Sequence, residues 1–129
     1  MDKEQYYKYM FLSGAIWNFA IGIINYLGTA FMLSDVAALY DLSIPPSLIF
    51  IDAFIGMILV VGIGLLVVSR DLVKNHDIVV MFIVEKFLMF IIFLAYFLMG
   101  AFNFFLLLPV IVDLVYGFLF LEFYINFKG

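Results

Sequence analysis

Cysteine is absent from this sequence, and histidine occurs only once, at His76. Without cysteine the chain can form neither a disulfide nor a thiolate metal site. A single histidine cannot supply both axial ligands of a bis-histidine haem within one chain. The sequence therefore predicts no metal site and no cofactor.

Charged residues are also scarce. They make up 12% of the 129 residues, whereas 68% are hydrophobic, and a soluble domain carries roughly 25% charged residues. The interior of a small soluble domain is too small to hold so many large side chains, so the composition excludes a water-soluble domain and favours a lipid bilayer as the surroundings. Six Lys and Arg residues are too few for a basic nucleic-acid-binding face, and we expect no nucleic-acid partner.

Four apolar runs cover most of the chain, at about residues 10–33, 47–69, 78–99 and 103–125. They are continuous rather than alternating, and each reaches the roughly 20 residues that a helix needs to cross a bilayer. Short connections make successive helices antiparallel neighbours. The sequence therefore predicts an all-α fold, an up-down-up-down four-helix transmembrane bundle that forms a single domain over residues 1–129.

The first connection, SDVAALYDLSIPPS, is the longest. We expect its middle to form one interfacial turn. Pro45 and Pro46 end any helix before them, and Ser47 is placed to help start the next span.

Basic residues outside the spans all fall on one side of the predicted bundle. They lie in the N-terminal tail, the second connection and the C-terminus, at Lys3, Lys8, Arg70, Lys74 and Lys128. The first and third connections contain no Lys or Arg. The positive-inside rule therefore predicts a multi-pass protein of the cell membrane with both termini in the cytoplasm.

Polar residues within the spans are the strongest functional signal, because a charge at the bilayer centre costs at least about 2.5 to 3.5 kcal/mol. Asn18 lies nine residues after Tyr9, Lys86 nine after Asp77, and Asp113 nine before Glu122, which places all three about 13 Å from one membrane edge. We expect Lys86 and Asp113 to form an ion pair with Asn18 beside them. Glu85 precedes Lys86 and can share the interior only if the two straddle one helix face. These four residues, Asn18, Glu85, Lys86 and Asp113, are the predicted polar centre.

A second polar layer is expected nearer the outside. It consists of Asn25, Asp52, Tyr96 and Asn103. In the first span the small and polar residues follow helical spacing and should face the bundle; they are Gly14, Asn18, Gly22, Asn25 and Thr29. Gly56, Gly62 and Gly64 in the second span permit close helix packing or leave room for a ligand. In the fourth span Pro109 frees the carbonyl of Phe105 four residues before it and is expected to kink the helix.

Two interpretations of the polar centre stay open from the sequence alone. The Lys86–Asp113 pair can fix helix register without any further role. It can equally form a proton or ion relay, or the polar end of a ligand pocket. Glycine-rich phosphate loops, HExxH and G-x-S-x-G are absent, and no catalytic residue is predicted.

Several short segments together resemble small DoxX-like four-helix membrane proteins. They are SGAIWN, PP, GIGLLVVSRD, VEKF and VDLVYGFLFLEF, in that order along nearly the whole chain. The resemblance implies a four-helix bundle in which Asn18, Lys86 and Asp113 are the positions of interest. Some DoxX-like proteins accompany redox enzymes as membrane subunits, and a distantly similar sterol-isomerase-like group binds apolar ligands against buried acids. The cysteine chemistry of some relatives has no counterpart in this chain.

Our leading hypothesis from the sequence is a binding or partner module. Its polar centre would hold a lipid-like or quinone-like molecule, or dock a membrane protein. The alternative is a small proton- or ion-coupled transporter that acts as a homo-oligomer, because four short helices barely enclose a pathway. A membrane isomerase ranks third.

Overall fold

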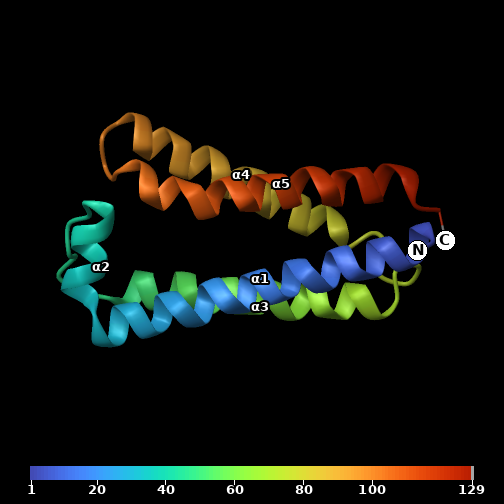
Figure 1. The fold of residues 1–129 in the computed structure, drawn as a ribbon, viewed down its shortest axis with the longest axis horizontal. Coiled ribbons are helices and arrows are strands. Elements are labelled where there is room, and N and C mark those ends of the chain that lie inside the picture. Colours follow the sequence, from blue (N-terminus) through green and yellow to red (C-terminus); the bar gives the residue numbers. More distant parts are fainter. Residues whose placement is uncertain (129) are drawn as a thin grey trace.

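The computed structural model describes residues 1–128, and that part of the chain is helical with no strand. Its helices are α1 (Lys3–Phe31), α2 (Leu33–Tyr40), α3 (Ile49–Arg70), α4 (Val79–Leu98) and α5 (Phe104–Asn126) (Figure 1). All of these except α2 are long and apolar enough to cross a membrane. The all-α prediction is confirmed, and the four long helices indicate a membrane protein.

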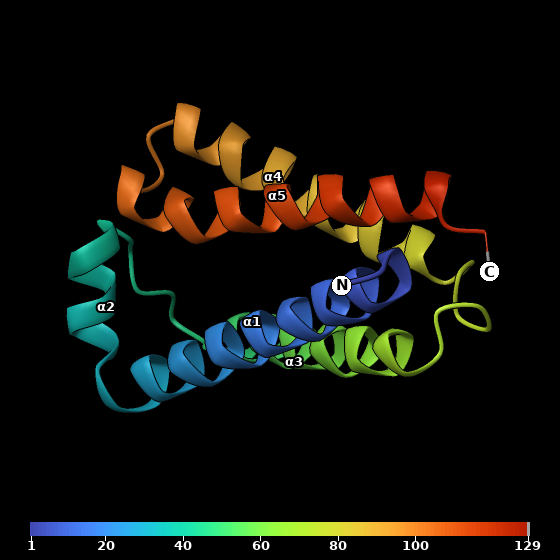
Figure 2. The same ribbon diagram turned by 45° about the vertical axis from the view of Figure 1, so that its right-hand side comes forward.

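The long helices form two layers, each made of one helix pair. Helix α1 packs along α3, and α4 packs along α5, in both views of the ribbon (Figures 1 and 2). The N- and C-termini lie at one end of the molecule, and α2 lies across the other end (Figure 1). We call these the terminal end and the α2 end.

Helix α1 begins earlier than the apolar run predicted, at Lys3 rather than near residue 10. The cause is Asp2, whose side chain accepts a hydrogen bond from the Gln5 backbone N–H at 2.7 Å and so caps the first turn. The acid Glu4 in that turn also suits the positive end of the helix dipole. The other three long helices differ from the predicted spans by no more than two residues at either end.

The first connection is the main departure from the prediction, because it contains the eight-residue helix α2 rather than a single turn. The helix ends at Asp41, which adopts a left-handed conformation with φ 56°. Aspartate tolerates this region better than most residues. The prolines then carry the chain to α3, where the Ser47 hydroxyl accepts a bond from the Ile49 N–H at 3.3 Å. Ser47 thus has the helix-starting role that its position indicated.

Most of the fully buried apolar side chains lie toward the terminal end, where all four long helices meet. This terminal core contains Tyr7, Met10, Phe11, Ala15, Leu65, Val68, Leu72, Val79, Phe82, Ile83, Phe120 and Phe123. Phe11 stacks on Phe120 with ring centroids 4.9 Å apart and meets Phe123 edge-on at 4.8 Å. The second connection is held to the same core, because the His76 ring stacks on Tyr124. The terminal core therefore joins the two layers.

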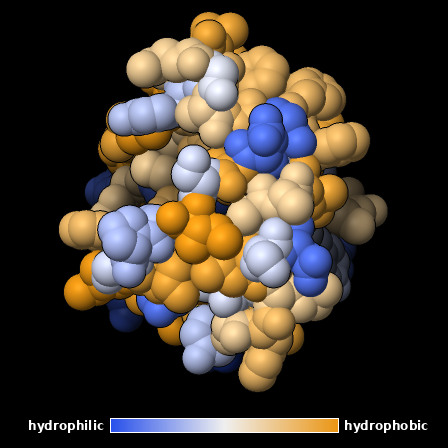
Figure 3. Space-filling model, turned by 90° about the vertical axis from the view of Figure 1, so that its left-hand side faces the viewer, coloured by the Kyte–Doolittle hydropathy of each residue, from blue (hydrophilic) through white to orange (hydrophobic). Residues whose placement is uncertain are grey.

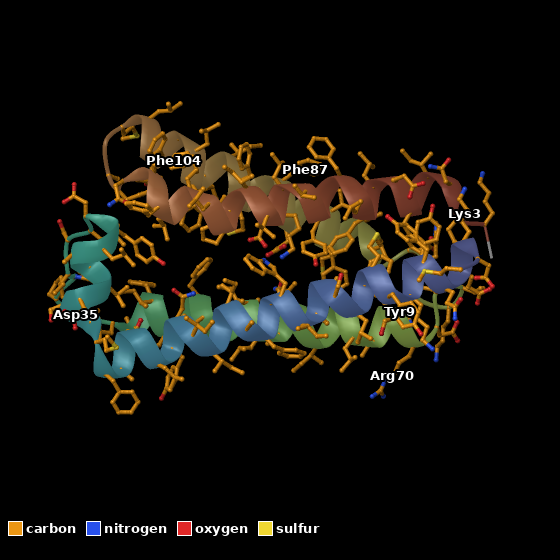
Figure 4. All side chains as sticks on the ribbon, in the orientation of Figure 1. Lys3, Tyr9, Asp35, Arg70, Phe87 and Phe104 are labelled. Atoms are coloured by element: carbon orange, nitrogen blue, oxygen red, sulfur yellow. The ribbon has the colours of Figure 1, made fainter. Side chains whose placement is uncertain are left out.

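The outer surface of the long helices is strongly apolar. Ile16, Phe50, Ile91 and Phe118 have exposed fractions between 57% and 84%, and the sticks in Figure 4 show side chains of this kind projecting from both layers. A soluble monomer rarely exposes apolar patches of this extent. Lipid is the solvent that such a surface requires.

Glycines allow α1 and α3 to pack closely within their layer. A Cβ added at Gly22 would lie 2.5 Å from Cδ2 of Leu59, and one at Gly62 would lie 3.1 Å from the Phe19 ring. Gly14, Asn18 and Gly22 are buried, so the predicted small and polar stripe of α1 faces the interior. Gly56 differs, because nothing lies within 4 Å of a Cβ added there.

Candidate functional site

A cavity of about 500 Å³ lies between the two layers in the half of the molecule toward α2. It is bounded by residues of all five helices and of the connection that follows α2, and its walls are mainly apolar side chains such as Ile21, Ile24, Ile55, Ile58, Met89, Ile92, Phe93, Phe102, Leu106 and Val110. Five polar side chains gather on its boundary toward the terminal core, namely Trp17, Asn18, Glu85, Lys86 and Asp113. We call this set the cavity floor. The volume is within the range of ligand pockets, roughly 300 to 1,000 Å³.

Lys86 is the centre of the floor. Its side chain is only 1% exposed, and its ammonium Nζ donates to Asn18 Oδ1 at 2.8 Å and to Asp113 Oδ1 at 3.0 Å. Glu85 Oε2 lies 3.7 Å from the same nitrogen, an ion-pair distance that is too long for a hydrogen bond. A buried cation is tolerated only when such partners compensate for lost hydration.

Three helices position these partners. Asn18 of α1 uses its amide oxygen for Lys86 and its amide nitrogen for the Ile58 carbonyl of α3, at 3.0 Å. Asp113 comes from α5, as does Gly117, where an added Cβ would lie 3.2 Å from Lys86 Cβ. The lack of a side chain at Gly117 therefore lets α4 approach α5 closely enough for the Lys86–Asp113 contact, which the sequence led us to expect.

Trp17 is a floor residue that we did not predict. Its indole Nε1–H donates to Asp113 Oδ1 at 3.0 Å, so one carboxylate oxygen accepts from Trp17 and Lys86 together. The sequence carried a weak signal for this contact, because Trp17 is adjacent to Asn18 and neighbouring helical positions diverge by only about 100°. The indole N–H of a tryptophan is a hydrogen-bond donor, and at this depth an intramembrane acid is an acceptor for it.

Glu85 is less well paired than Asp113. Its Oε2 atom is buried and has no hydrogen-bond partner among residues 1–128, although the carboxylate lies beside Lys86. With both acids and Lys86 ionised, the floor carries two negative charges and one positive charge. The floor therefore has an excess of hydrogen-bond acceptors over donors.

The predicted outer layer is not brought together. Asn25 and Tyr96 line the cavity, and the Asn25 amide donates to its own helix, to the Ile21 carbonyl at 2.7 Å. Asp52 lies in the first turn of α3, is exposed and does not line the cavity. Asn103 lies before α5 and caps it. Counting residues from a membrane edge gives depth alone, and only Asn25 and Tyr96 also have the rotation that faces inward.

The helix breaker of the fourth span lies at the cavity too. Pro109 is inside α5 and is one of the lining residues. Because proline has no N–H, the Phe105 carbonyl receives no helical hydrogen bond from that position.

Two further polar contacts join the layers in the terminal half. The Tyr7 hydroxyl donates to Glu122 Oε1 at 2.8 Å, and the Tyr116 hydroxyl bonds to Ser13 Oγ at 3.0 Å. Both connect α1 with α5. Neither contact was predicted from the sequence.

Metal binding has no support in the described part of the chain, where no three His, Asp or Glu side chains are grouped closely enough to hold an ion. No family model, curated protein or solved structure matches the chain. The likeness to small DoxX-like proteins therefore stays a prediction.

Proposed function

We propose that this chain is a multi-pass membrane protein that binds an elongated, mainly apolar molecule in the cavity between its two layers. The observation that carries the proposal is the combination of an apolar cavity with a polar floor at one end. Pockets for small molecules typically join hydrophobic walls with a few polar groups that orient the ligand. A lipid-like or quinone-like molecule has the matching form, with a long apolar body and one polar end.

The proposed orientation puts the terminal end in the cytoplasm. Lys3 and Arg70 both lie near that end, whereas Asp35 lies at the α2 end (Figure 4). The positive-inside rule favours the cytoplasm for the end that carries the basic residues. The surface at the α2 end mixes hydrophilic and hydrophobic residues (Figure 3), as suits a membrane–water interface. In this orientation the cavity lies in the outer half of the membrane.

Native mass spectrometry of the protein released from mild detergent tests the proposal. We expect the wild-type chain to retain a molecule that Ile55→Trp expels, because Ile55 lines the cavity and the larger indole would fill it. The matched control is Ile63→Trp on the same helix, where the side chain is 54% exposed. Loss of the adduct in Ile55→Trp but not in Ile63→Trp supports the proposal. A bare wild-type chain, or equal retention in all three proteins, contradicts it.

Docking of a membrane protein partner is a variant of the same proposal, in which a partner helix covers the cavity rather than a small molecule filling it. The same spectra distinguish the two, because a partner would add the mass of a second polypeptide to the wild-type chain.

A second candidate function is proton-coupled transport by an oligomer of this chain. It is favoured by one observation, the second carboxylate beside Lys86, since Glu85 Oε2 lacks a hydrogen-bond donor and could exchange a proton. Protein in liposomes should then show a pH-driven flux that Lys86→Met abolishes and Lys74→Met in the exposed connection leaves intact. Flat traces from the wild-type protein would contradict this candidate.

A further inference from the structure

The charged side chains of the cavity floor differ in how accessible they are. Lys86 is 1% exposed, whereas Glu85 is 24% and Asp113 is 25% exposed, and all three line the cavity. A molecule that enters the cavity can therefore reach the two carboxylates, while the ammonium is covered by its own partners.

Each donor atom of the floor already bonds to an acceptor of the protein. Lys86 Nζ donates to Asn18 and Asp113, the Asn18 amide nitrogen donates to the Ile58 carbonyl, and the Trp17 indole donates to Asp113. A ligand whose polar end only accepts hydrogen bonds, such as a carboxylate, a phosphate or a quinone carbonyl, finds only the remaining N–H groups of Lys86 and Asn18, two side chains that are 1% and 2% exposed.

The acceptors of the floor are not all used. Glu85 Oε2 has no donor among the described residues. At Asp113 both incoming bonds go to Oδ1, and within residues 1–128 no donor reaches its second oxygen. Glu85 Oε2 is itself enclosed, so a donor on the ligand would pair with the open oxygens, Glu85 Oε1 and Asp113 Oδ2, which hold no hydrogen bond among the described residues. The net charge of the ionised floor adds to this preference, since it repels an anionic group.

We propose that the ligand of this cavity carries a hydrogen-bond-donating polar end, a hydroxyl or an ammonium group, which binds the Glu85 carboxylate through Oε1, with its apolar body along the cavity walls. The inference rests on the proposed binding function and narrows its ligand class. It favours long-chain alcohols, sterol-like molecules, quinols and lipophilic amines over fatty acids, phospholipid head groups and oxidised quinones.

The chain supplies its own reporter, because Trp17 is the single tryptophan and lines the cavity. The protein is placed in phosphatidylcholine nanodiscs and titrated with tail-brominated dodecanol, dodecylamine, methyl dodecyl ether and dodecanoate. Bromine quenches indole fluorescence at short range, and only quenching that saturates is counted, since partition into lipid gives a component that does not saturate. We expect the alcohol and the amine to bind about tenfold or more tightly than the ether and the carboxylate, the ratio for one recovered hydrogen bond.

Variants at Glu85 locate the effect. Glu85→Leu removes the acceptor and should bring all four probes to similar affinity. Glu85→Gln keeps an acceptor oxygen without charge, so the alcohol should stay ahead of the ether while the amine loses its advantage; this variant carries the test if Glu85→Leu fails to fold. Asp52→Leu is the control, because Asp52 is an exposed acid that does not line the cavity, and it should leave the wild-type order intact.

The outcomes separate the two proposals. Saturable binding of all four probes with equal affinity in the wild-type protein overturns the donor inference and leaves the binding function standing. Saturable binding of none overturns both. A wild-type preference for the amine alone or for the alcohol alone supports the inference and identifies which donor the cavity takes.

Discussion

Lys86 is the basic residue of the cavity, and its burial makes each of its partners necessary. Removing one partner of a buried ion pair leaves an uncompensated charge, which is costlier than the pair itself is favourable. Asn18, Asp113 and Glu85 share this compensation across α1, α4 and α5. The Lys86–Asn18 and Trp17–Asp113 hydrogen bonds thus tie the two layers together at the point where the apolar terminal core gives way to the cavity.

Replacing Lys86 with Met should lower the free energy of unfolding by about 3 kcal/mol, because Glu85 and Asp113, which are only 24% and 25% exposed, would then lose their cation. Thermal unfolding in detergent followed by circular dichroism measures the effect. The control is Lys74→Met in the exposed second connection, which should change stability by less than about 0.5 kcal/mol.

The double variant Lys86→Met with Asp113→Leu tests whether the loss of stability comes from the interaction between the two side chains. If the two side chains compensate each other, the pair of substitutions should cost clearly less than the sum of the single ones. Additive losses would show that the 3.0 Å contact contributes no coupling energy.

For single residues, the sequence indicated how deep each side chain lies in the membrane but not which face of its helix the side chain occupies. Asn18, Lys86 and Asp113 could be placed together because each lies at the same count from its span edge, and polar groups in lipid need partners. Trp17 was not placed with them, because tryptophan is found on both the lipid-facing and the interior faces of membrane helices. Which face Trp17 occupies depends on how α1 packs on α3. Asp52 was assigned by depth to the outer polar layer with Asn25 and Tyr96, yet it is exposed and does not line the cavity.

At the scale of the helices, small residues decide where α1 and α3 approach each other. A side chain at Gly22 of α1 would collide with Leu59 of α3 at 2.5 Å, whereas Gly56 of α3 has open space around it. Gly22→Val should therefore destabilise the protein by about 1 to 3 kcal/mol through overpacking, and Gly56→Val should stay within about 0.5 kcal/mol of the wild type. Unfolding in detergent compares the two. Equal losses would indicate a general intolerance of β-branched residues rather than a close α1–α3 contact.

Helix α2 is held over the α2 end by one residue of another connection. The Asn103 side chain donates to the Leu39 carbonyl at 2.7 Å, its backbone N–H donates to the Tyr40 carbonyl at 3.0 Å, and its Oδ1 accepts from the Phe105 N–H at the start of α5. The side chain therefore both caps α5 and fastens α2.

Asn103→Ala should cost about 0.5 to 2 kcal/mol as a lost helix cap and should also raise hydrogen exchange throughout α2, since the bond to Leu39 is lost. Hydrogen exchange in nanodiscs read by mass spectrometry resolves the segment. Ser47→Ala is the control, because the Ser47 hydroxyl accepts from the Ile49 N–H at the start of α3 and bonds to no residue of α2, and it should raise exchange only at the start of α3. Unchanged protection of α2 in Asn103→Ala would contradict the fastening role.

The helices themselves were easier to predict than the connections. Continuous apolar runs fixed α3, α4 and α5 to within two residues, because lipid permits little other structure there. Helix α2 was underestimated, since the segment is short and its apolar residues, Val36 and Ala37 among them, line the cavity while the helix packs against α1 and α5. That contact depends on tertiary packing, which residue patterns in a single segment do not reveal.

For the whole molecule, the two layers converge in the terminal core and enclose the cavity toward α2. The proposed function depends on this asymmetry, and its access route depends on which end faces the cytoplasm. The absence of cysteine makes the orientation directly measurable, because every engineered cysteine is the single thiol in the chain.

With the terminal end in the cytoplasm, Asp35→Cys should react with a membrane-impermeant maleimide in intact cells, and Lys74→Cys should react only after the membrane is permeabilised. Both side chains are exposed in the structure, so burial cannot account for a difference between them. Labelling of Lys74→Cys alone in intact cells would show that the orientation is the reverse of the proposed one, and labelling of both variants would indicate a mixed population.

Since the chain has only six Lys and Arg residues, removing two of the basic residues at the terminal end should change the orientation of part of the population. In the Asp35→Cys protein, the double substitution Arg70→Gln and Lys74→Gln should reduce labelling of the cysteine in intact cells if the basic residues of the second connection set the orientation.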